Sequence, residues 1–266
     1  MSTENVEIGI IGGSGLYDPE LLTNVKQIEI DTPYGSPSNS LTIGEYRGRK
    51  VAFLPRHGKK HTILPHLINY RANISAFKQI GVTRIIAVTA TGSLRQDIAP
   101  GNFAIPSQFI DFTKTRIGTF SKIGNVYHVS TANPFCPHMQ TIAYDLIKEK
   151  NVPVHKDVTY VCIEGPRFST RSESKFFQST GSDIIGMTLV PECQLAREAG
   201  ICYVSVSMAT DYDVWADTPV SNQEVLATFK KNISTIKSIL GDLIEKTPIE
   251  RTCQCEHSLD DAVSGS

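Results

Sequence analysis

Long apolar runs are missing from this sequence. No stretch of about 18 apolar residues occurs in the chain, so no membrane-spanning helix is expected. Runs of Lys or Arg are missing too: 26 basic residues face 27 acidic ones, and the formal net charge is -1. This balance argues against a basic surface for nucleic acid. The N-terminus, MSTENVEIGII, lacks a basic region followed by an apolar core and a cleavage site, and we expect a cytoplasmic protein.

Cysteine is also scarce, and six residues in 266 do not indicate a disulfide-stapled secreted fold. Four of them lie in or near apolar stretches and are expected to be buried as small hydrophobic side chains: Cys136, Cys162, Cys193 and Cys202. Cys253 and Cys255 differ because they lie in the polar segment TCQCEH, where a thiol has no evident packing partner. A disulfide, a metal site and chance all stay open for this pair. A zinc site needs four ligands and only His257 is close by, so a metal is the least favoured explanation.

The arrangement of apolar residues predicts one large domain. The chain has 40% hydrophobic residues, no internal repeat and no Pro/Ser-rich linker, so residues 1–247 are expected to form that domain and residues 248–266 a polar C-terminal tail. Short apolar runs alternate with stretches in which apolar residues recur every three or four positions. These patterns predict strands at 6–11, 82–90, 157–165 and 201–209, hairpin strands between 26 and 55, and helices at 67–80, 138–150, 171–180, 191–199 and 221–245. The alternation indicates an α/β fold with a mixed central β-sheet flanked by helices.

Polar residues follow the predicted strands at the points where the strands end. The segments are GGSG at 12–15, RHG at 56–58, TATGS at 89–93, EGPRFSTR at 164–171 and TDYD at 210–213. Because ligands in open α/β sheets bind beyond the carboxyl ends of the strands, these segments are expected to form one site. Glycine backbone N–H groups, Ser14 and Arg56 suit an anion such as phosphate, whereas Asp211 and Asp213 give the site an acidic side.

Each of these segments is weak evidence when taken alone. GGSG lacks the third glycine of a dinucleotide-binding fingerprint, because Asp18 stands there, and no Lys-Ser/Thr follows to make a Walker motif. A plain tight turn explains GGSG equally well. His57, His61 and His66 suggest a metal at first sight, but nearby prolines break the helix that a pair of ligands would use, and no acid completes the set.

The ordered set of motifs is specific where the single motifs are not. It comprises IGIIGGSGLYD, TPYGSPS, FLPRHGKKHTILPHLINYRANI, ATGSLR, PGNFAIPSQFIDFTKTR, EGPRFSTRSES, IIGMTLVPECQLAREAGICY and MATDYDVW, in this order over residues 8–215. Together they resemble the methylthioadenosine phosphorylase branch of the trimeric purine nucleoside phosphorylase family. The resemblance implies a pentosyltransferase of purine and methionine salvage, which cleaves 5'-methylthioadenosine with inorganic phosphate to adenine and 5-methylthioribose-1-phosphate.

The resemblance also implies roles for individual residues. Phosphate would be held by Ser14, Arg56, His57, Thr89, the backbone N–H of Ala90, and Thr188. The nucleoside would contact Met187 at the ribose, Phe168 on the base, Asp211 and Asp213 at the polar edge of the base, and His128, Val225 and Leu226 at the 5' end. Asp211 and Asp213 would be the catalytic pair. No metal and no organic cofactor are implied, since phosphate is a co-substrate.

By the resemblance, Asp211 and Ser169 point to an aminopurine. A carboxylate accepts a hydrogen bond from the exocyclic amine of adenine and, when protonated, donates to ring N7 and makes adenine a better leaving group. The 6-oxopurine relatives carry Asn at the position of Asp211 and Glu at the position of Ser169. By this resemblance, Asp211 would read the amine and protonate N7, while Asp213 would orient or share the proton.

Other functions stay open at this point. A broad-specificity purine nucleoside phosphorylase that also uses adenosine, inosine or guanosine is the main alternative, because ADTPVSNQEVL matches the family less well and places polar Asn222 in the expected apolar wall. A binding module that has lost catalysis would show damage at Arg56, Thr89 or Asp211, and all three are intact. A dehydrogenase domain would need the missing glycine.

Assembly and the tail complete what the resemblance implies. Family members form homotrimers, sometimes paired into homohexamers, and His128 would reach the ligand of a neighbouring subunit. The Cys-x-Cys tail is similar to that of archaeal members from hot environments, where intracellular disulfides do occur. A disulfide involving Cys253 and Cys255 is therefore a hypothesis.

Overall fold

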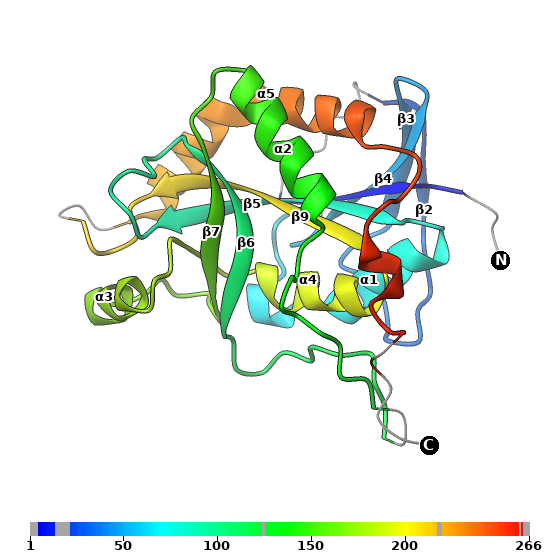
Figure 1. Ribbon diagram of the computed structural model, residues 1–266, viewed down its shortest axis with the longest axis horizontal. Helices are drawn as coiled ribbons and strands as arrows, with labels where there is room; N and C mark the ends of the chain where they lie inside the picture. Colours follow the sequence, from blue (N-terminus) through cyan, green and yellow to red (C-terminus); the bar gives the residue numbers. More distant parts are fainter. Residues whose placement is uncertain (1–4, 14–21, 124–125, 217–219, 261, 263–266) are drawn as a thin grey trace.

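The computed structural model describes residues 5–13, 22–123, 126–216, 220–260 and 262 (Figure 1). Within these ranges the chain has the expected α/β fold, with one mixed sheet between helices, and the strand order is β2-β3-β4-β1-β5-β8-β7-β6-β9. The strands are β1 Ile8–Gly12, β2 Thr23–Ile28, β3 Leu41–Tyr46, β4 Arg49–Pro55, β5 Arg84–Ser93, β6 Phe103–Phe112, β7 Val154–Ile163, β8 Ile184–Gly186 and β9 Cys202–Asp211. The helices are α1 Tyr70–Gln79, α2 Pro137–Glu149, α3 Arg171–Ser179, α4 Leu189–Glu198 and α5 Asn222–Lys246, with short 3-10 helices at Pro65–Leu67 and Gln254–His257.

Strand β5 is the centre of the sheet. It pairs in parallel with β1 and with β9, and its last residues, Gly92 and Ser93, pair antiparallel with β8. Because β9 also pairs with β6, the strands β5, β8, β7, β6 and β9 close into a ring. β4 runs parallel to β1, so the carboxyl ends of β4, β1, β5 and β9 all point the same way. Ligands bind at such an edge in open α/β sheets.

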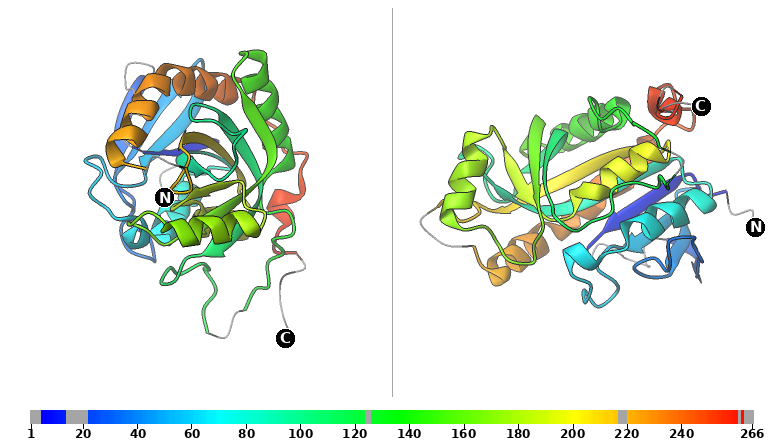
Figure 2. Two further views of the ribbon diagram at one scale, coloured as in Figure 1. Left: turned by 90° about the vertical axis from the view of Figure 1, so that its left-hand side faces the viewer. Right: turned by 90° about the horizontal axis from the view of Figure 1, so that it is seen from below.

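Helices cover both faces of the sheet (Figures 1 and 2). In Figure 1, α2 and α5 lie above the sheet, α1 and α4 lie below it, and α3 stands at one end. Each face has its own apolar cluster: Ile74 and Phe77 of α1 join one, and Ile236 and Leu240 of α5 join the other. The apolar stripe on each helix predicted this burial, because residues three and four apart share a face.

Most of the predicted elements are confirmed, with ends that differ by a few residues. The sequence analysis did not identify β6, because Pro106 and two polar residues interrupt its apolar pattern, FAIPSQFIDF. It did not identify β8 either, since three residues are too few for periodicity to be informative. None of the helices in the described part of the chain is long and apolar enough to cross a membrane.

The C-terminal tail differs from the expectation. Cys253 and Cys255 are only 9% and 3% exposed and pack in the apolar cluster beneath α2 and α5. The expectation that these thiols lack a packing partner was therefore wrong. The segment folds back because Arg84 Nη2 donates to the carbonyl of Ile249 at 2.7 Å and Arg251 Nη1 donates to that of Gly200 at 2.8 Å.

The other four cysteines are buried, as predicted, and all six are free thiols in the structure.

Candidate active site

The expected site residues gather where the parallel strands end. β4 leads directly into Arg56 and His57, β5 carries Thr89 and Ala90, and β9 ends at Asp211. The backbone N–H of Arg56 donates to the carbonyl of Gly12 at 3.0 Å, which joins the ends of β4 and β1. Ala90 is exposed although the residues on either side of it in β5 are buried, so the sheet is open to a ligand there. Ser14, the remaining predicted phosphate ligand on this side, lies outside the described residues.

Arg56 is held by a buried carboxylate. Its side chain is 2% exposed and forms a bidentate ion pair with Glu192 of α4. The distances are 2.6 Å from Nε to Oε2 and 2.7 Å from Nη2 to Oε1. The hydroxyl of Tyr203 donates to Glu192 Oε1 at 2.8 Å. Burial opposes the charge of Arg56, but the Glu192 carboxylate outweighs it and raises the pKa of the guanidinium. The pair fixes the planar fork in one orientation and leaves part of its N–H groups for a ligand.

His57 is a neutral imidazole near pH 7. Burial lowers its pKa to about 4, and the neighbouring charge of Arg56 acts in the same direction. Nδ1 lies 2.9 Å from the carbonyl oxygen of Ile63, and since that oxygen can only accept, Nδ1 carries the proton. Nε2 of the neutral ring is therefore an acceptor. The ring stacks on His61 with 4.4 Å between centroids, which fixes its plane.

A group of hydroxyls lies between β5 and β9. Thr89 Oγ1 donates to Ser207 Oγ at 3.0 Å, and the hydroxyls of Ser205 and Ser207 are also 3.0 Å apart. The register explains the contact, because Thr89 pairs with Ser207 across the two strands. Thr188 precedes α4 and is 8% exposed, yet its side chain makes no capping hydrogen bond. These hydroxyls supply donors for an anion without adding charge.

Asp211 and Asp213 form the acidic side of the site and are 9% and 4% exposed. Asp211 accepts from the Thr210 hydroxyl at 2.7 Å and from the backbone N–H of Asp213 at 2.8 Å. Burial raises the pKa of Asp211 to about 6 and raises that of Asp213 as well. The Oδ2 atom of Asp213 is buried, and although no group in the described ranges meets hydrogen-bond geometry with it, the nearby Ser174 hydroxyl partly offsets the effect of burial on the Asp213 pKa. Among the described residues, neither Lys nor Arg contributes to the hydrogen bonds or the electrostatics of this pair.

Gly92 makes room for this pair. A Cβ at this position would lie 3.0 Å from Asp211 Oδ1 and 3.2 Å from Asp213 Cβ, so a larger residue would displace the carboxylates. Asp213 itself has a φ of 49°, in the left-handed region where aspartate is one of the better-tolerated residues. Trp215 holds the loop on its far side, because its Nε1 donates to the carbonyl of Ser93 at 2.7 Å.

The predicted base and ribose residues lie on loops beyond β7 and β8. Met187 packs against Gly165, whose φ of 65° suits glycine and whose Cβ position would be 2.5 Å from the Met187 sulfur. Phe168 is 39% exposed, and the buried hydroxyl of Ser169 has no hydrogen-bond partner among the described residues. An exposed ring beside an unpartnered hydroxyl suits a surface that a planar ligand covers.

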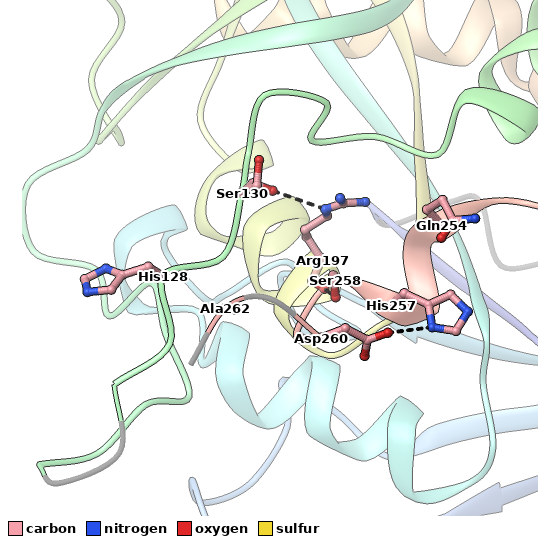
Figure 3. Close-up of a pocket in the computed structure, with 8 residues that line it drawn as sticks. All are labelled: His128, Ser130, Arg197, Gln254, His257, Ser258, Asp260 and Ala262. Carbon is pink, nitrogen blue, oxygen red and sulfur yellow. Dashed lines mark hydrogen bonds and ion pairs between the residues drawn. The ribbon is translucent and has the colours of Figure 1, made fainter. Parts of the chain in front are cut away.

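The predicted 5' residues lie farther from these contacts. Val225 and Leu226 are in the first turns of α5, half-buried and 50% exposed, respectively. His128 is exposed, and the structure places it beside the C-terminal tail, where its backbone N–H donates to the carbonyl of Ala262 at 2.7 Å (Figure 3). The side chain of Asn222 is outside the described part of the chain.

Sequence reasoning missed three residues of this site: Glu192, Ser205 and Ser207. Two of them had a usable signal, since serines two apart in the apolar strand YVSVSMA must point to one face, the face of Tyr203. Glu192 had a weaker signal, an acid in the apolar segment TLVPECQLA. Its role becomes visible only when the fold places it against Arg56.

Comparison with known proteins defines the family. A model of the phosphorylase superfamily matches residues 7–245, and the chain belongs to this superfamily. S-methyl-5'-thioadenosine phosphorylase of Nitrosopumilus maritimus is 60% identical over 259 residues, which cover 97% of this chain and 98% of the relative.

Solved structures give the same result. Methylthioadenosine phosphorylase from an antarctic soil metagenomic library superposes with a TM-score of 0.92 at 40% identity, covering 98% of this chain and 93% of that one. Methylthioadenosine phosphorylase from Schistosoma mansoni, in complex with adenine, superposes with a TM-score of 0.91 at 37% identity, covering 97% and 99%. The resemblance that the ordered motifs suggested is confirmed.

Proposed function

We propose that this protein is an S-methyl-5'-thioadenosine phosphorylase, a pentosyltransferase that transfers 5-methylthioribose from adenine to phosphate. The products are adenine and 5-methylthioribose-1-phosphate. The observation that carries the proposal is the buried pair Asp211 and Asp213 at the end of β9, on the same edge of the sheet as the buried cation Arg56 after β4. A site with an acidic side and an anion-binding side suits a purine and a phosphate.

Phosphate binding is assigned to the β4 and β5 side. Arg56, oriented by Glu192, offers planar donors, and the hydroxyls of Thr89 and Thr188 add neutral ones. Nε2 of neutral His57 can accept a hydrogen bond from the P–OH group of a phosphate monoanion or dianion, which a protonated imidazole could not do. Ser14 and the backbone N–H of Ala90 complete the predicted set.

Adenine recognition is assigned to the two aspartates. Asp211, with its pKa near 6, is poised to accept from the exocyclic amine and to hold a proton for N7, while Asp213 orients or shares that proton. A 6-oxopurine would put a carbonyl oxygen against a buried carboxylate, which is unfavourable. This preference disfavours the broad-specificity alternative.

The reaction then needs positioning and charge stabilisation only. The glycosidic bond lengthens, positive charge builds on the ribose, and the electrons of the broken bond pass to adenine as N7 takes a proton. A phosphate oxygen forms the new bond to the anomeric carbon. Met187 and Phe168 are assigned to the ribose and the base, and Val225 and Leu226 to the methylthio group. No covalent enzyme intermediate and no organic cofactor are needed.

Assembly follows from the predicted role of His128. If it reaches a neighbouring ligand, the working enzyme is a homo-oligomer, a trimer or a hexamer, and acts on small molecules in the cytoplasm. The division into a domain at 1–247 and a tail at 248–266 is part of the same proposal. A disulfide involving Cys253 and Cys255 in that tail stays a hypothesis.

The test is phosphorolysis of methylthioadenosine, adenosine and inosine side by side, with and without phosphate. We expect adenine from methylthioadenosine only when phosphate is present, and little hypoxanthine from inosine. Comparable turnover of inosine would replace this proposal with the broad-specificity one. No turnover of any of the three would make the chain a binding protein.

A further inference from the structure

Four cysteines from distant parts of the chain meet at one point. They are Cys136 directly before α2, Cys202 at the start of β9, and Cys253 and Cys255 in the tail. Their Sγ atoms all lie within 4.8 Å of one another, and all four residues are buried. His257, the only ligand that the sequence suggested beside the tail pair, is exposed and binds Asp260 instead.

The spacing suits four sulfurs around one metal ion. In a tetrahedral zinc tetrathiolate, Zn–S bonds of about 2.3 Å place the sulfurs about 3.8 Å apart. The Cys202 and Cys253 sulfurs are 3.3 Å apart, far longer than a disulfide bond of about 2.05 Å. Ordinary burial of small side chains does not explain why four thiols from three segments share one point.

The remaining two cysteines provide an internal comparison. Cys162 and Cys193 are also buried, but neither belongs to the group of four. Burial raises the pKa of the Cys162 thiol to about 12 and raises that of Cys193, so both stay protonated.

Positive groups surround the cluster. Arg197 Nη1 lies 3.9 Å from Cys255 Sγ, and Arg84 interacts electrostatically with Cys202. Cys136 also occupies the N-terminus of α2, a 13-residue helix whose dipole favours negative charge there. A zinc ion with four thiolates carries a net charge of -2, which such outer groups stabilise.

From this geometry we propose that Cys136, Cys202, Cys253 and Cys255 bind one zinc ion as a structural site. Binding converts four thiols to thiolates and releases their protons, with no change of oxidation state. With four protein ligands the site has no open position, so its role is to fasten the tail to β9 and α2. It is separate from the phosphorolysis site and does not depend on the proposed reaction.

The proposed zinc site would also stabilise residues that do not bind the metal. A cavity of about 420 Å³ lies between the tail and the segment of His128 and Ser130, and Arg197 and Ser258 are among the residues that line it (Figure 3). Ser258 donates to the carbonyl of Arg197 and the backbone of His128 binds that of Ala262, so the tail supports this segment. Loss of the metal would therefore loosen both the tail and the segment of His128 and Ser130.

The test uses the full chain purified under reducing conditions without chelator. We expect about one zinc ion per chain by elemental analysis, and thiolate-to-metal charge-transfer bands after exchange with Co²⁺. Cys253→Ser/Cys255→Ser should lose at least tenfold in zinc occupancy, whereas the control Cys193→Ala should keep it. Removing zinc from the reduced wild type should lower Tm and speed proteolysis of the tail, with no such effect in the double variant.

Two results would overturn the proposal. One is a metal-free chain whose mass is lower than that of the reduced chain by two or four hydrogens and in which peptide mapping shows these cysteines joined as disulfides. The other is a chain with four free thiols that binds neither Zn²⁺ nor Co²⁺ when they are supplied. Either result leaves the phosphorolysis assay unaffected, so failure of this proposal is distinguishable from failure of the proposed function.

Discussion

The two sides of the candidate site treat buried charge in opposite ways. On the β4 side, Arg56 is buried with its counter-ion, and Glu192 is in turn bound by Tyr203. On the β9 side, Asp211 and Asp213 are also buried but have only hydroxyl and N–H partners and no counter-ion in the described ranges. Arg56 therefore has a counter-ion without any ligand, whereas the two aspartates do not.

This difference indicates that the Arg56 side is fixed by the fold, whereas the aspartate side is completed by a ligand. A paired arginine has a fixed geometry and contributes to folding, since removal of either partner strands a buried charge. Unpaired carboxylates with raised pKa values oppose folding and are expected where a ligand later supplies the partner.

The largest effect is expected from breaking the paired side. Arg56→Met leaves Glu192 charged and buried, and should cost about 3–5 kcal/mol of unfolding free energy in urea titrations. The double variant Arg56→Met/Glu192→Leu should cost less, because no charge is stranded. A single variant as stable as the wild type would show that the pair is not a structural unit.

The next effect concerns catalysis on the unpaired side. Asp211→Asn cannot give a proton to N7, so kcat/KM for methylthioadenosine should fall by about 10²- to 10³-fold, or about 3–4 kcal/mol. The CD spectrum and a Tm no lower than that of the wild type serve as folding controls. A variant with near-normal kcat/KM would remove Asp211 from the mechanism.

The same substitution should stabilise the fold. The pKa of Asp211 rises from an unfolded value of 3.8 to about 6, so the native state binds more protons between these values and stability falls as pH rises through this window. Above pH 6 the penalty is fully present and amounts to at most about 3 kcal/mol. Asp211→Asn should therefore raise Tm at pH 7.5, with the gain disappearing near pH 4.

Asp97 is a matched control, because its pKa is shifted in the opposite direction from that of Asp211. Asp97 is exposed, and a hydrogen bond from Arg95 lowers its pKa. Asp97→Asn should give no gain in Tm at pH 7.5. Equal gains in the two variants would mean that burial of Asp211 is not the cause.

A smaller effect is expected from the hydroxyls on the phosphate side. Thr89→Val keeps the shape of the side chain but removes one neutral donor, and should raise the KM for phosphate by about tenfold, or about 1.4 kcal/mol. The KM for the nucleoside should change little. Thr141→Val, which alters an exposed threonine of α2, is the control, and equal effects would deny Thr89 a role at phosphate.

The smallest effect is expected at the 5' end. Leu226→Ala should raise the KM for methylthioadenosine relative to adenosine by a few-fold, under about 1.5 kcal/mol, because only part of one apolar contact is lost. The comparison with adenosine in the same preparation corrects for any general loss of activity. A ratio that does not move would place the methylthio group elsewhere.

The sequence predicted the fold and the unpaired side of the site better than the paired side. The helices followed from apolar periodicity, whereas β6 was hidden by Pro106 and β8 by its length. Asp211 and Asp213 are neighbours in the chain, so one motif contained both. Arg56 and Glu192 are 136 positions apart, and the cysteine cluster joins three segments, so these groupings depend on the fold and not on any local pattern.

The most direct test of the central claim compares two nucleosides that differ only at the 6-position. The ratio of kcat/KM for methylthioadenosine over methylthioinosine should be measured for the wild type and for Asp211→Asn. If the unpaired carboxylates read the base, the wild-type ratio should be about 100 or more and should fall by at least tenfold in the variant. An unchanged ratio would mean that the base preference is set elsewhere and would contradict the assignment of the two aspartates.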